Sequence, residues 1–87
     1  MPLTLSTPIS PTPRLRAGSG LRLVPAAVDR WRVVDVTGSI IGHLDAVPDP
    51  RGTRYRARRY HARAHVFRDI GDFWSADDAA DCLRFAR

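Results

Sequence analysis

The sequence predicts an α+β fold in which an antiparallel sheet of three or four strands packs on one C-terminal helix, behind a disordered N-terminal tail. Three observations support this prediction. Residues 1–20 hold four prolines among serines and threonines, a composition that breaks both helix and sheet. Three β-rich stretches follow, separated by turn-forming residues, and a helical pattern begins near residue 75. We therefore expect a tail over residues 1–20 and one small β-β-β-α domain over residues 21–87.

The first hairpin is predicted from the turn that joins two β-rich stretches. Asp35-Val-Thr-Gly38 places Asp and Gly where a type I turn with a following bulge prefers them. Residues 31–36 and 39–47 then form paired strands, and in this register Val34 faces Ile40 and Val33 faces Ile41 across the hairpin.

The remaining strands are predicted from turn residues and alternation. Gly42 indicates a bend or a close backbone approach within the second strand. The Pro-rich loop 48–52 ends that strand, and a third strand runs over residues 53–61. Residues 66–70 form either a short fourth strand or an extended lead-in to the helix. The apolar residues 21–24 either add an edge strand or lie over the sheet.

The helix has the clearest signals in the chain. Ser75 is the predicted N-cap, and Asp78 stands three residues later, as in a capping box. One apolar stripe at helical spacing is expected to face the sheet: Ala76, Ala79, Ala80 and Leu83. Four aromatic side chains are expected to complete the core of so small a domain: Trp31, Phe73, Trp74 and Phe85.

Composition limits the classes of function. The 87 residues carry a formal charge of +5, and all fourteen basic side chains are Arg, which favours phosphate-rich or acidic partners. The single cysteine excludes an intrachain disulfide and a cysteine-based zinc site. No stretch reaches the roughly 20 apolar residues of a membrane span, and the start of the chain lacks a signal-peptide pattern. We expect a soluble cytoplasmic protein.

Positive charge is concentrated in residues 51–68, which hold seven Arg and no acidic residue. Within the third strand, alternation places Arg54, Arg56, Arg58 and Tyr60 on one face. Residues two apart on a strand are separated by roughly 7 Å, which is close to the spacing of phosphates along one DNA strand. The sequence therefore predicts a small DNA-binding protein that grips double-stranded DNA. Its expected nucleic-acid-binding residues are Arg51, Arg54, Arg56, Arg58, Tyr60 and Arg63.

This interpretation has two alternatives. Arginines on a strand face can simply be solvated, which prevents aggregation through sheet edges, or they can bind an acidic protein surface. The interpretation requires arginines that project together into solvent without aspartates that neutralise each of them.

A second class of function is a protein-interaction module. The predicted hairpin puts apolar side chains on both faces of the sheet, and one helix covers only one of them. An exposed apolar face would suit a homodimer or another protein partner.

The sequence contains no residue pattern that indicates catalysis, metal binding or cofactor binding. His61 and His65 are four residues apart, a spacing that makes a metal pair on a helix but not on a strand and turn. No residue pattern indicates a nucleophile or a general acid–base pair in a pocket. We expect a protein that is not an enzyme, with no cofactor, no metal and no small-molecule substrate.

The order of three strands followed by Gly71-x-Phe73-x-Ser75-x-x-Asp78-Ala79 resembles the arm-type, AP2-like DNA-binding domain of phage tyrosine integrases. This resemblance covers residues 31–86. It implies a three-stranded sheet that enters the major groove, a helix behind it, and groove contacts from Arg54, Arg56 and Arg58. The chain lacks a recombinase domain after the helix, so the resemblance implies a stand-alone DNA-binding module.

Overall fold

The computed structural model describes residues 11–85, which form five strands and one helix in a simple order along the chain. The elements are β1 (Arg22–Ala27), β2 (Arg30–Val34), β3 (Ile40–Asp49), β4 (Gly52–His61), β5 (Val66–Phe73) and α1 (Ala76–Phe85).

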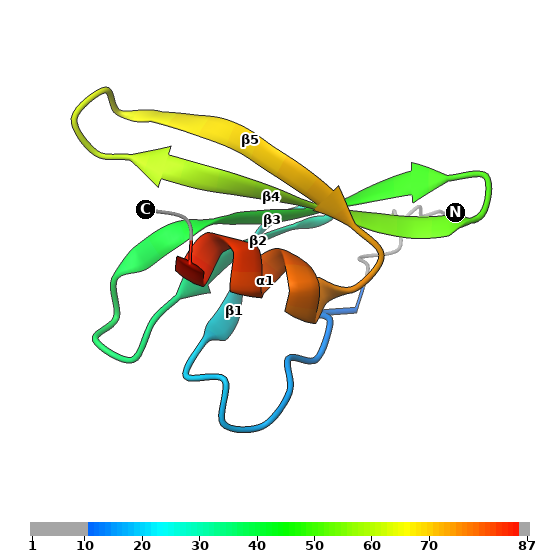
Figure 1. The fold of residues 1–87 in the computed structure, drawn as a ribbon, viewed down its shortest axis with the longest axis horizontal. Helices are drawn as coiled ribbons and strands as arrows, with labels where there is room; N and C mark the ends of the chain where they lie inside the picture. The colour runs from blue at the N-terminus through cyan, green and yellow to red at the C-terminus, as the bar shows by residue number, and fades with distance from the viewer. Residues whose placement is uncertain (1–10, 86–87) are drawn as a thin grey trace, which may run out of the picture.

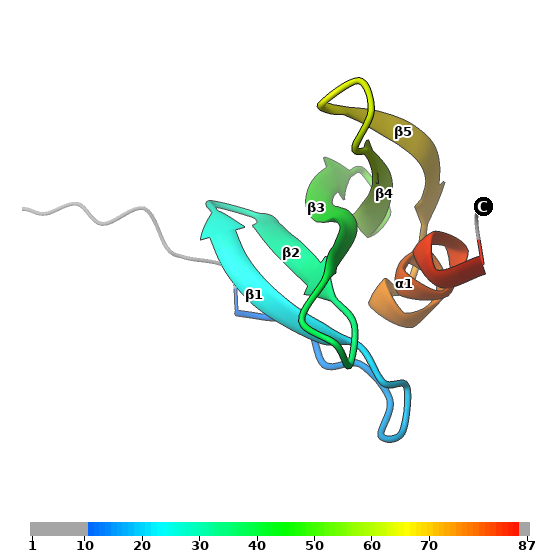
Figure 2. The same ribbon diagram turned by 90° about the vertical axis from the view of Figure 1, so that its left-hand side faces the viewer.

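The five strands form one antiparallel sheet in which each strand pairs with its neighbours in sequence. The helix α1 packs against β3, β4 and β5 (Figure 1). The sheet curls around the side on which α1 lies, so that β1 and β2 stand at a steep angle to β4 and β5 (Figure 2). One sheet face is therefore covered by α1, and we call the opposite side of β2–β5 the open face.

The prediction of an antiparallel sheet with one C-terminal helix is confirmed, but the sheet has five strands and not three or four. Both uncertain segments join the sheet. The apolar patch at residues 21–24 lies largely within β1, which pairs with β2 as an edge strand. Residues 66–73 form the other edge, because the pairing with β4 continues beyond the predicted end at Ile70 as far as Phe73.

The turn between β2 and β3 is the one that the sequence predicts. Gly38 adopts φ 87° and donates its N–H to the carbonyl of Asp35 at 3.0 Å. Val34 lies opposite Ile40, as predicted, but a further bulge between Val33 and Val34 shifts the register so that Val33 lies opposite Gly42 and not opposite Ile41. The predicted pairing of Val33 with Ile41 is therefore wrong by one residue.

The bulge also removes the exposed apolar sheet face that the sequence predicted. Val33 and Leu44 are both fully buried in one core cluster, and Ile41 packs against the same cluster. Val34 is also buried. Val33, Leu44 and Ile41 thus meet in one core, whereas Val34 is buried outside that cluster and Ile40 is exposed.

The helix is capped and buried as its pattern predicts. The Ser75 hydroxyl accepts a hydrogen bond from the N–H of Asp78 at 3.0 Å, which satisfies one of the donors left free at a helix start. All four residues of the apolar stripe are buried, at most 7% exposed. Small alanines at three of these positions let α1 approach the sheet closely.

The aromatic residues divide between core and surface. Trp31 is 3% exposed in the core and Phe73 packs against it, as expected. Trp74 is 50% exposed and Phe85 is 71% exposed, so neither completes the core. The curled sheet brings Leu21 and Leu23 against the core instead.

The predicted tail contains residues that contact the domain. Residues 1–10 lie outside the described part of the chain. Leu15 packs against the core cluster, and the Arg16 guanidinium lies 2.6 Å from Asp81 on α1. The boundary predicted at residue 21 therefore leaves out at least two residues that contact the folded domain.

Gly42 provides a test of the close approach between α1 and the sheet. A Cβ atom at this position would lie 2.3 Å from the carbonyl oxygen of Arg58 and 2.7 Å from a methyl of Leu83. Backbone cannot move aside at low cost, so Gly42→Ala should lower the free energy of unfolding by about 2–3 kcal/mol.

Urea denaturation measures this loss, and Gly71→Ala is the matched control. An added Cβ at Gly71 meets only the ring of Phe73, at 3.0 Å, and a side chain can rotate. Equal losses in the two variants would contradict the close approach of the β4 backbone and of Leu83 on α1 to Gly42.

Candidate nucleic-acid interface

Strand β4 places its arginines as alternation predicts. Ala57 is fully buried beneath α1, so its neighbours Arg56 and Arg58 project from the open face, together with Arg54. Each of the three is partly buried. The face is therefore correctly predicted, and what surrounds these guanidinium groups decides what they can bind.

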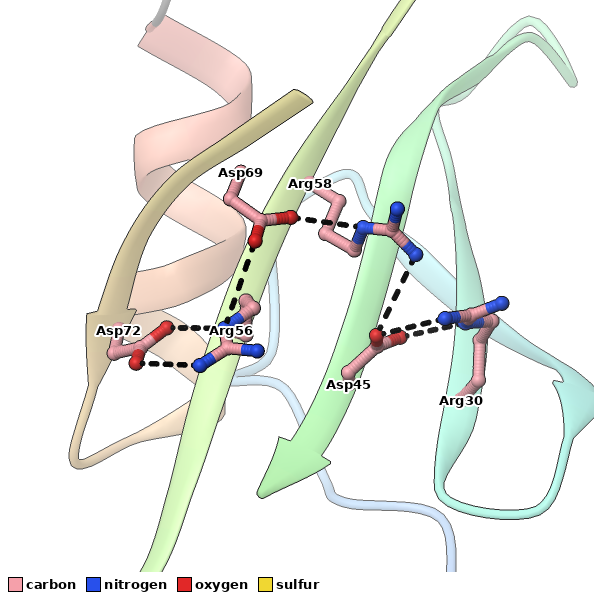
Figure 3. A network of polar contacts seen from close by, with 6 residues as sticks. All are labelled: Arg30, Asp45, Arg56, Arg58, Asp69 and Asp72. Atoms are coloured by element: carbon pink, nitrogen blue, oxygen red, sulfur yellow. Dashed lines mark hydrogen bonds and ion pairs between the residues drawn. The ribbon is translucent and has the colours of Figure 1, made fainter. Parts of the chain in front are cut away.

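Aspartates from the neighbouring strands neutralise the arginines of the open face. The Arg56 Nε lies 2.9 Å from Asp72, and the Arg58 Nε lies 2.9 Å from Asp69. A second carboxylate, on Asp45, lies 3.7 Å from Arg58. Figure 3 shows that these pairs continue across four strands as one alternating network. Its members are Arg30, Asp45, Arg58, Asp69, Arg56 and Asp72.

Asp45 joins the two halves of this network. It accepts two hydrogen bonds from Arg30, at 2.8 and 3.0 Å, in the paired geometry that a guanidinium and a carboxylate prefer. Its side chain is only 16% exposed. The hydrogen bonding that Arg30 donates to Asp45 is the main reason why the pKa of Arg30 is raised above its ordinary value.

Backbone register explains why the charges alternate. Asp45 lies directly opposite both Arg30 on β2 and Arg56 on β4. A bulge in the β4–β5 pairing then places Asp69 opposite Arg58 and Asp72 opposite Arg56. Asp69 and Asp72 are three residues apart, so without the extra residue in β5 they would face opposite sides of the sheet.

The expected row of unneutralised arginines is therefore absent from the open face. On β2–β5 this face carries five arginines and four aspartates, a net of one positive charge. The arginines are Arg30, Arg32, Arg54, Arg56 and Arg58, and the aspartates are Asp45, Asp49, Asp69 and Asp72. Phosphate approaching this surface would meet carboxylates between the guanidinium groups.

Arg51 and Arg54 meet at an aromatic side chain. Their guanidinium carbons lie 5.4 and 4.5 Å from the ring centroid of Trp74, within the range of cation–π attraction. Asp49 lies 3.8 Å from Arg51 and 3.5 Å from Arg54. Trp74, expected in the core, thus lies on the surface against two arginines.

Tyr60 belongs to an aromatic group at the far end of the open face. Its ring lies 5.0 Å from that of Phe67, which stacks on His43 at 4.0 Å. The hydroxyl of Tyr60 lies 3.4 Å from Nδ1 of His65. Tyr60 is therefore packed against a ring and is not aligned with the arginines as a free stacking platform.

A second group of arginines has no such partners. Arg59 and Arg68 lie directly opposite each other on β4 and β5, and Arg63 is in the exposed turn between these strands. Within residues 11–85, none of the three has a carboxylate oxygen within 4.0 Å. We call Arg59, Arg63 and Arg68 the distal arginine cluster.

The geometry of this cluster is unfavourable without an anion. Like charges directly opposite on neighbouring strands destabilise a sheet, and Arg59 and Arg68 are such a pair. The segment 59–68 contains no acidic residue. Of the residues expected to bind nucleic acid, only Arg63 belongs to this cluster.

The sequence contains a signal for part of this arrangement. The turn at residues 49–52 fixes Asp45 opposite Arg56 once strands β3 and β4 are aligned. The distal arginine cluster is harder to predict, because alternation places Arg59 on the same side of β4 as Ala57, the side that α1 covers. The hairpin β4–β5 extends past the end of α1 (Figure 1). How much of a hairpin a helix leaves uncovered depends on the relative lengths of the two, which local sequence signals do not give.

The described part of the chain contains no cluster of three or more His, Cys, Asp or Glu side chains that would hold a metal ion. No helix within it is long and apolar enough to cross a membrane. Comparisons with protein families, with curated proteins and with solved structures find no match to this chain.

Asp45→Asn tests the ion-pair network. The substitution leaves Arg30 without its carboxylate and Arg58 with Asp69 alone, so the free energy of unfolding should fall by about 1–2 kcal/mol. Asp69→Asn is the control, because Asp69 is 56% exposed and water replaces much of its interaction. Urea denaturation compares the two, and an equal or larger loss for Asp69→Asn would contradict the central position of Asp45.

Acid should destabilise the domain through His43 first. Burial and the positive charge of Arg30 lower the pKa of His43 below its ordinary value of 6.5. Below pH 6.5 the unfolded chain therefore binds more protons at this site than the folded chain, and stability falls as the pH falls. Denaturation of the protein and of His43→Gln between pH 7 and 5 checks this. Parallel curves for the two proteins would contradict it.

Proposed function

We propose that this chain is a small nucleic-acid-binding protein that holds the phosphate backbone with the distal arginine cluster, and not with the arginines of the open face. The observation that carries the proposal is the absence of any carboxylate within 4.0 Å of Arg59, Arg63 and Arg68 among the described residues. Unpaired guanidinium groups can clasp phosphate in a bidentate way without first breaking an ion pair.

The position of the cluster supports this proposal. Its arginines lie on a two-stranded ribbon that extends beyond α1 (Figure 1), and a ribbon of this kind fits the major groove of duplex DNA. Bound phosphate would also relieve the repulsion between Arg59 and Arg68. Double-stranded DNA is therefore the polymer that we propose.

The open face has a structural role in this proposal. Its ion pairs link β2 to β3, β3 to β4 and β4 to β5. Competition with phosphate would break contacts within the sheet and bring DNA against Asp45 and Asp69. The groove contacts implied by the integrase resemblance would thus move from Arg54, Arg56 and Arg58 to the end of the same hairpin.

The alternative of a protein-interaction module requires an exposed apolar face on the sheet. It depended on apolar side chains on the uncovered sheet face, and Val34 and Leu44 are buried. The described surface offers exposed apolar side chains at separate sites, such as Trp74 and Phe85 at opposite ends of α1. We therefore do not pursue a dimer through the sheet.

The distal arginine cluster is tested by the triple variant Arg59→Gln, Arg63→Gln and Arg68→Gln. If the cluster neutralises three phosphates, the slope of log affinity against log salt should change by about 2.7 in the variant. Fluorescence anisotropy of a labelled duplex at several salt concentrations measures both the affinity and the slope.

The control is the triple variant Arg14→Gln, Arg22→Gln and Arg32→Gln. It removes the same charge from three exposed arginines that lie elsewhere and have no ion pair in the described chain. It should keep most of the affinity and most of the slope. Equal losses in the two variants would show that net charge alone drives binding, and no binding by the unaltered protein would refute the proposed function.

A further inference from the structure

The largest difference from the sequence-based expectation is a pocket. The sequence predicted no small-molecule site, yet a cavity of about 510 Å³ lies beside the C-terminal half of α1. This volume is within the range of small-molecule sites, roughly 300–1,000 Å³. The walls come from segment 19–21, the β2–β3 turn, β3, β4 and α1.

Two guanidinium groups give the pocket its chemistry. Arg59 and Arg84 both line it, and neither has a carboxylate within 4.0 Å among residues 11–85. The Nη2 atom of Arg84 is buried and has no hydrogen-bond partner. A buried donor without an acceptor is costly, and an oxyanion in the pocket would supply the acceptor.

The position of Arg84 in the last turn of α1 does not explain this unsatisfied donor. A positive charge near a helix C-terminus is favourable, but the interaction leaves Nη2 without a hydrogen-bond acceptor in the structure. The nearby ring of Phe85, 5.7 Å from the guanidinium carbon, offers only a weak contact.

Asp35 is the only acidic residue that lines the pocket, and its Oδ1 already accepts hydrogen bonds within the β2–β3 turn. Its Oδ1 accepts hydrogen bonds from the N–H and hydroxyl of Thr37 and from the N–H of Ser39, at 2.6–3.0 Å. The hydroxyl of Thr37 is the main reason why the pKa of Asp35 is lowered. This carboxylate therefore stabilises the β2–β3 turn and does not pair with Arg59 or Arg84.

The rest of the lining is partly apolar. Leu21, Ile41 and Leu83 line the pocket, together with Val36 from the β2–β3 turn. An inorganic anion alone would leave this surface without a partner. A ligand with an oxyanion at one end and an apolar group at the other would match both parts of the pocket.

We propose that this pocket binds a small organic oxyanion, a phosphate monoester or carboxylate that carries an apolar group, through Arg84 and Arg59. The oxyanion accepts hydrogen bonds from the two guanidinium groups, including Nη2 of Arg84, and the apolar group packs against Leu83 and Ile41. The pocket shares Arg59 with the distal arginine cluster. Its key residue, Arg84, does not belong to that cluster.

Phenyl phosphate is the probe, and inorganic phosphate and phenol represent its two halves. In an NMR titration, phenyl phosphate should shift the amides of Leu21, Ile41 and Leu83 saturably and bind more tightly than either half. Arg84→Gln should weaken this binding by about tenfold or more, as expected when a charge-assisted hydrogen bond is lost. Arg84→Lys should lose less, because it keeps the charge but not the guanidinium fork.

Arg32→Gln is the matched control, because Arg32 is an exposed arginine outside both the pocket and the distal arginine cluster. It should leave phenyl phosphate binding unchanged. Binding that Arg84→Gln does not weaken, or shifts that spread over all exposed arginines, would overturn the proposal. Equal affinity for inorganic phosphate and phenyl phosphate would also overturn it, because the apolar lining would then be unused.

The terminal phosphate of a nucleic acid strand shares this chemistry with a free ligand. A 5′-phosphorylated oligonucleotide that binds more tightly than its 5′-hydroxyl form, with the difference lost in Arg84→Gln, would assign the pocket to a strand end. Equal binding of the two forms, together with binding of phenyl phosphate, would assign it to a free ligand. The pocket and the proposed nucleic-acid function can therefore fail separately.

Discussion

The alternation of arginine and aspartate on the open face is the interaction on which the rest of the arrangement depends. Asp45 is mostly buried between Arg30 and Arg58, and Asp72 holds Arg56. These pairs cross the sheet from β2 to β5, on the side that α1 does not cover. On this side, which no helix covers, the ion pairs add side-chain links between neighbouring strands to the backbone hydrogen bonds of the sheet.

This network divides the arginines of one strand into two groups with different chemistry. Arg56 and Arg58 have carboxylate partners in the sheet, whereas Arg59, the next residue, points to the other side and has none among the described residues. The unsatisfied charge therefore lies at the end of hairpin β4–β5 and beside the end of α1. The proposed nucleic-acid surface and the proposed oxyanion pocket both follow from this division.

Much of the fold can be predicted from local signals. The turn at Asp35, the cap at Ser75 and the apolar stripe of α1 each depend on a few neighbouring residues, and each is confirmed. Two bulges could not be predicted, because an extra residue in a strand depends on the pairing of its neighbours. They move Gly42 opposite Val33 and bring Asp69 to the open face, and the second of them neutralises the predicted binding row.

The rate at which arginine Nε–H protons exchange with water tests most directly the division of the arginines into paired and unpaired groups. In NMR spectra of the Nε–Hε groups, without any ligand, Arg30, Arg56 and Arg58 should show slow exchange with water, because each Nε–H donates to a carboxylate at 2.8–2.9 Å. Arg63 and Arg68 should exchange rapidly. Rapid exchange at all five positions would contradict the network, and with it the separation of paired from unpaired arginines.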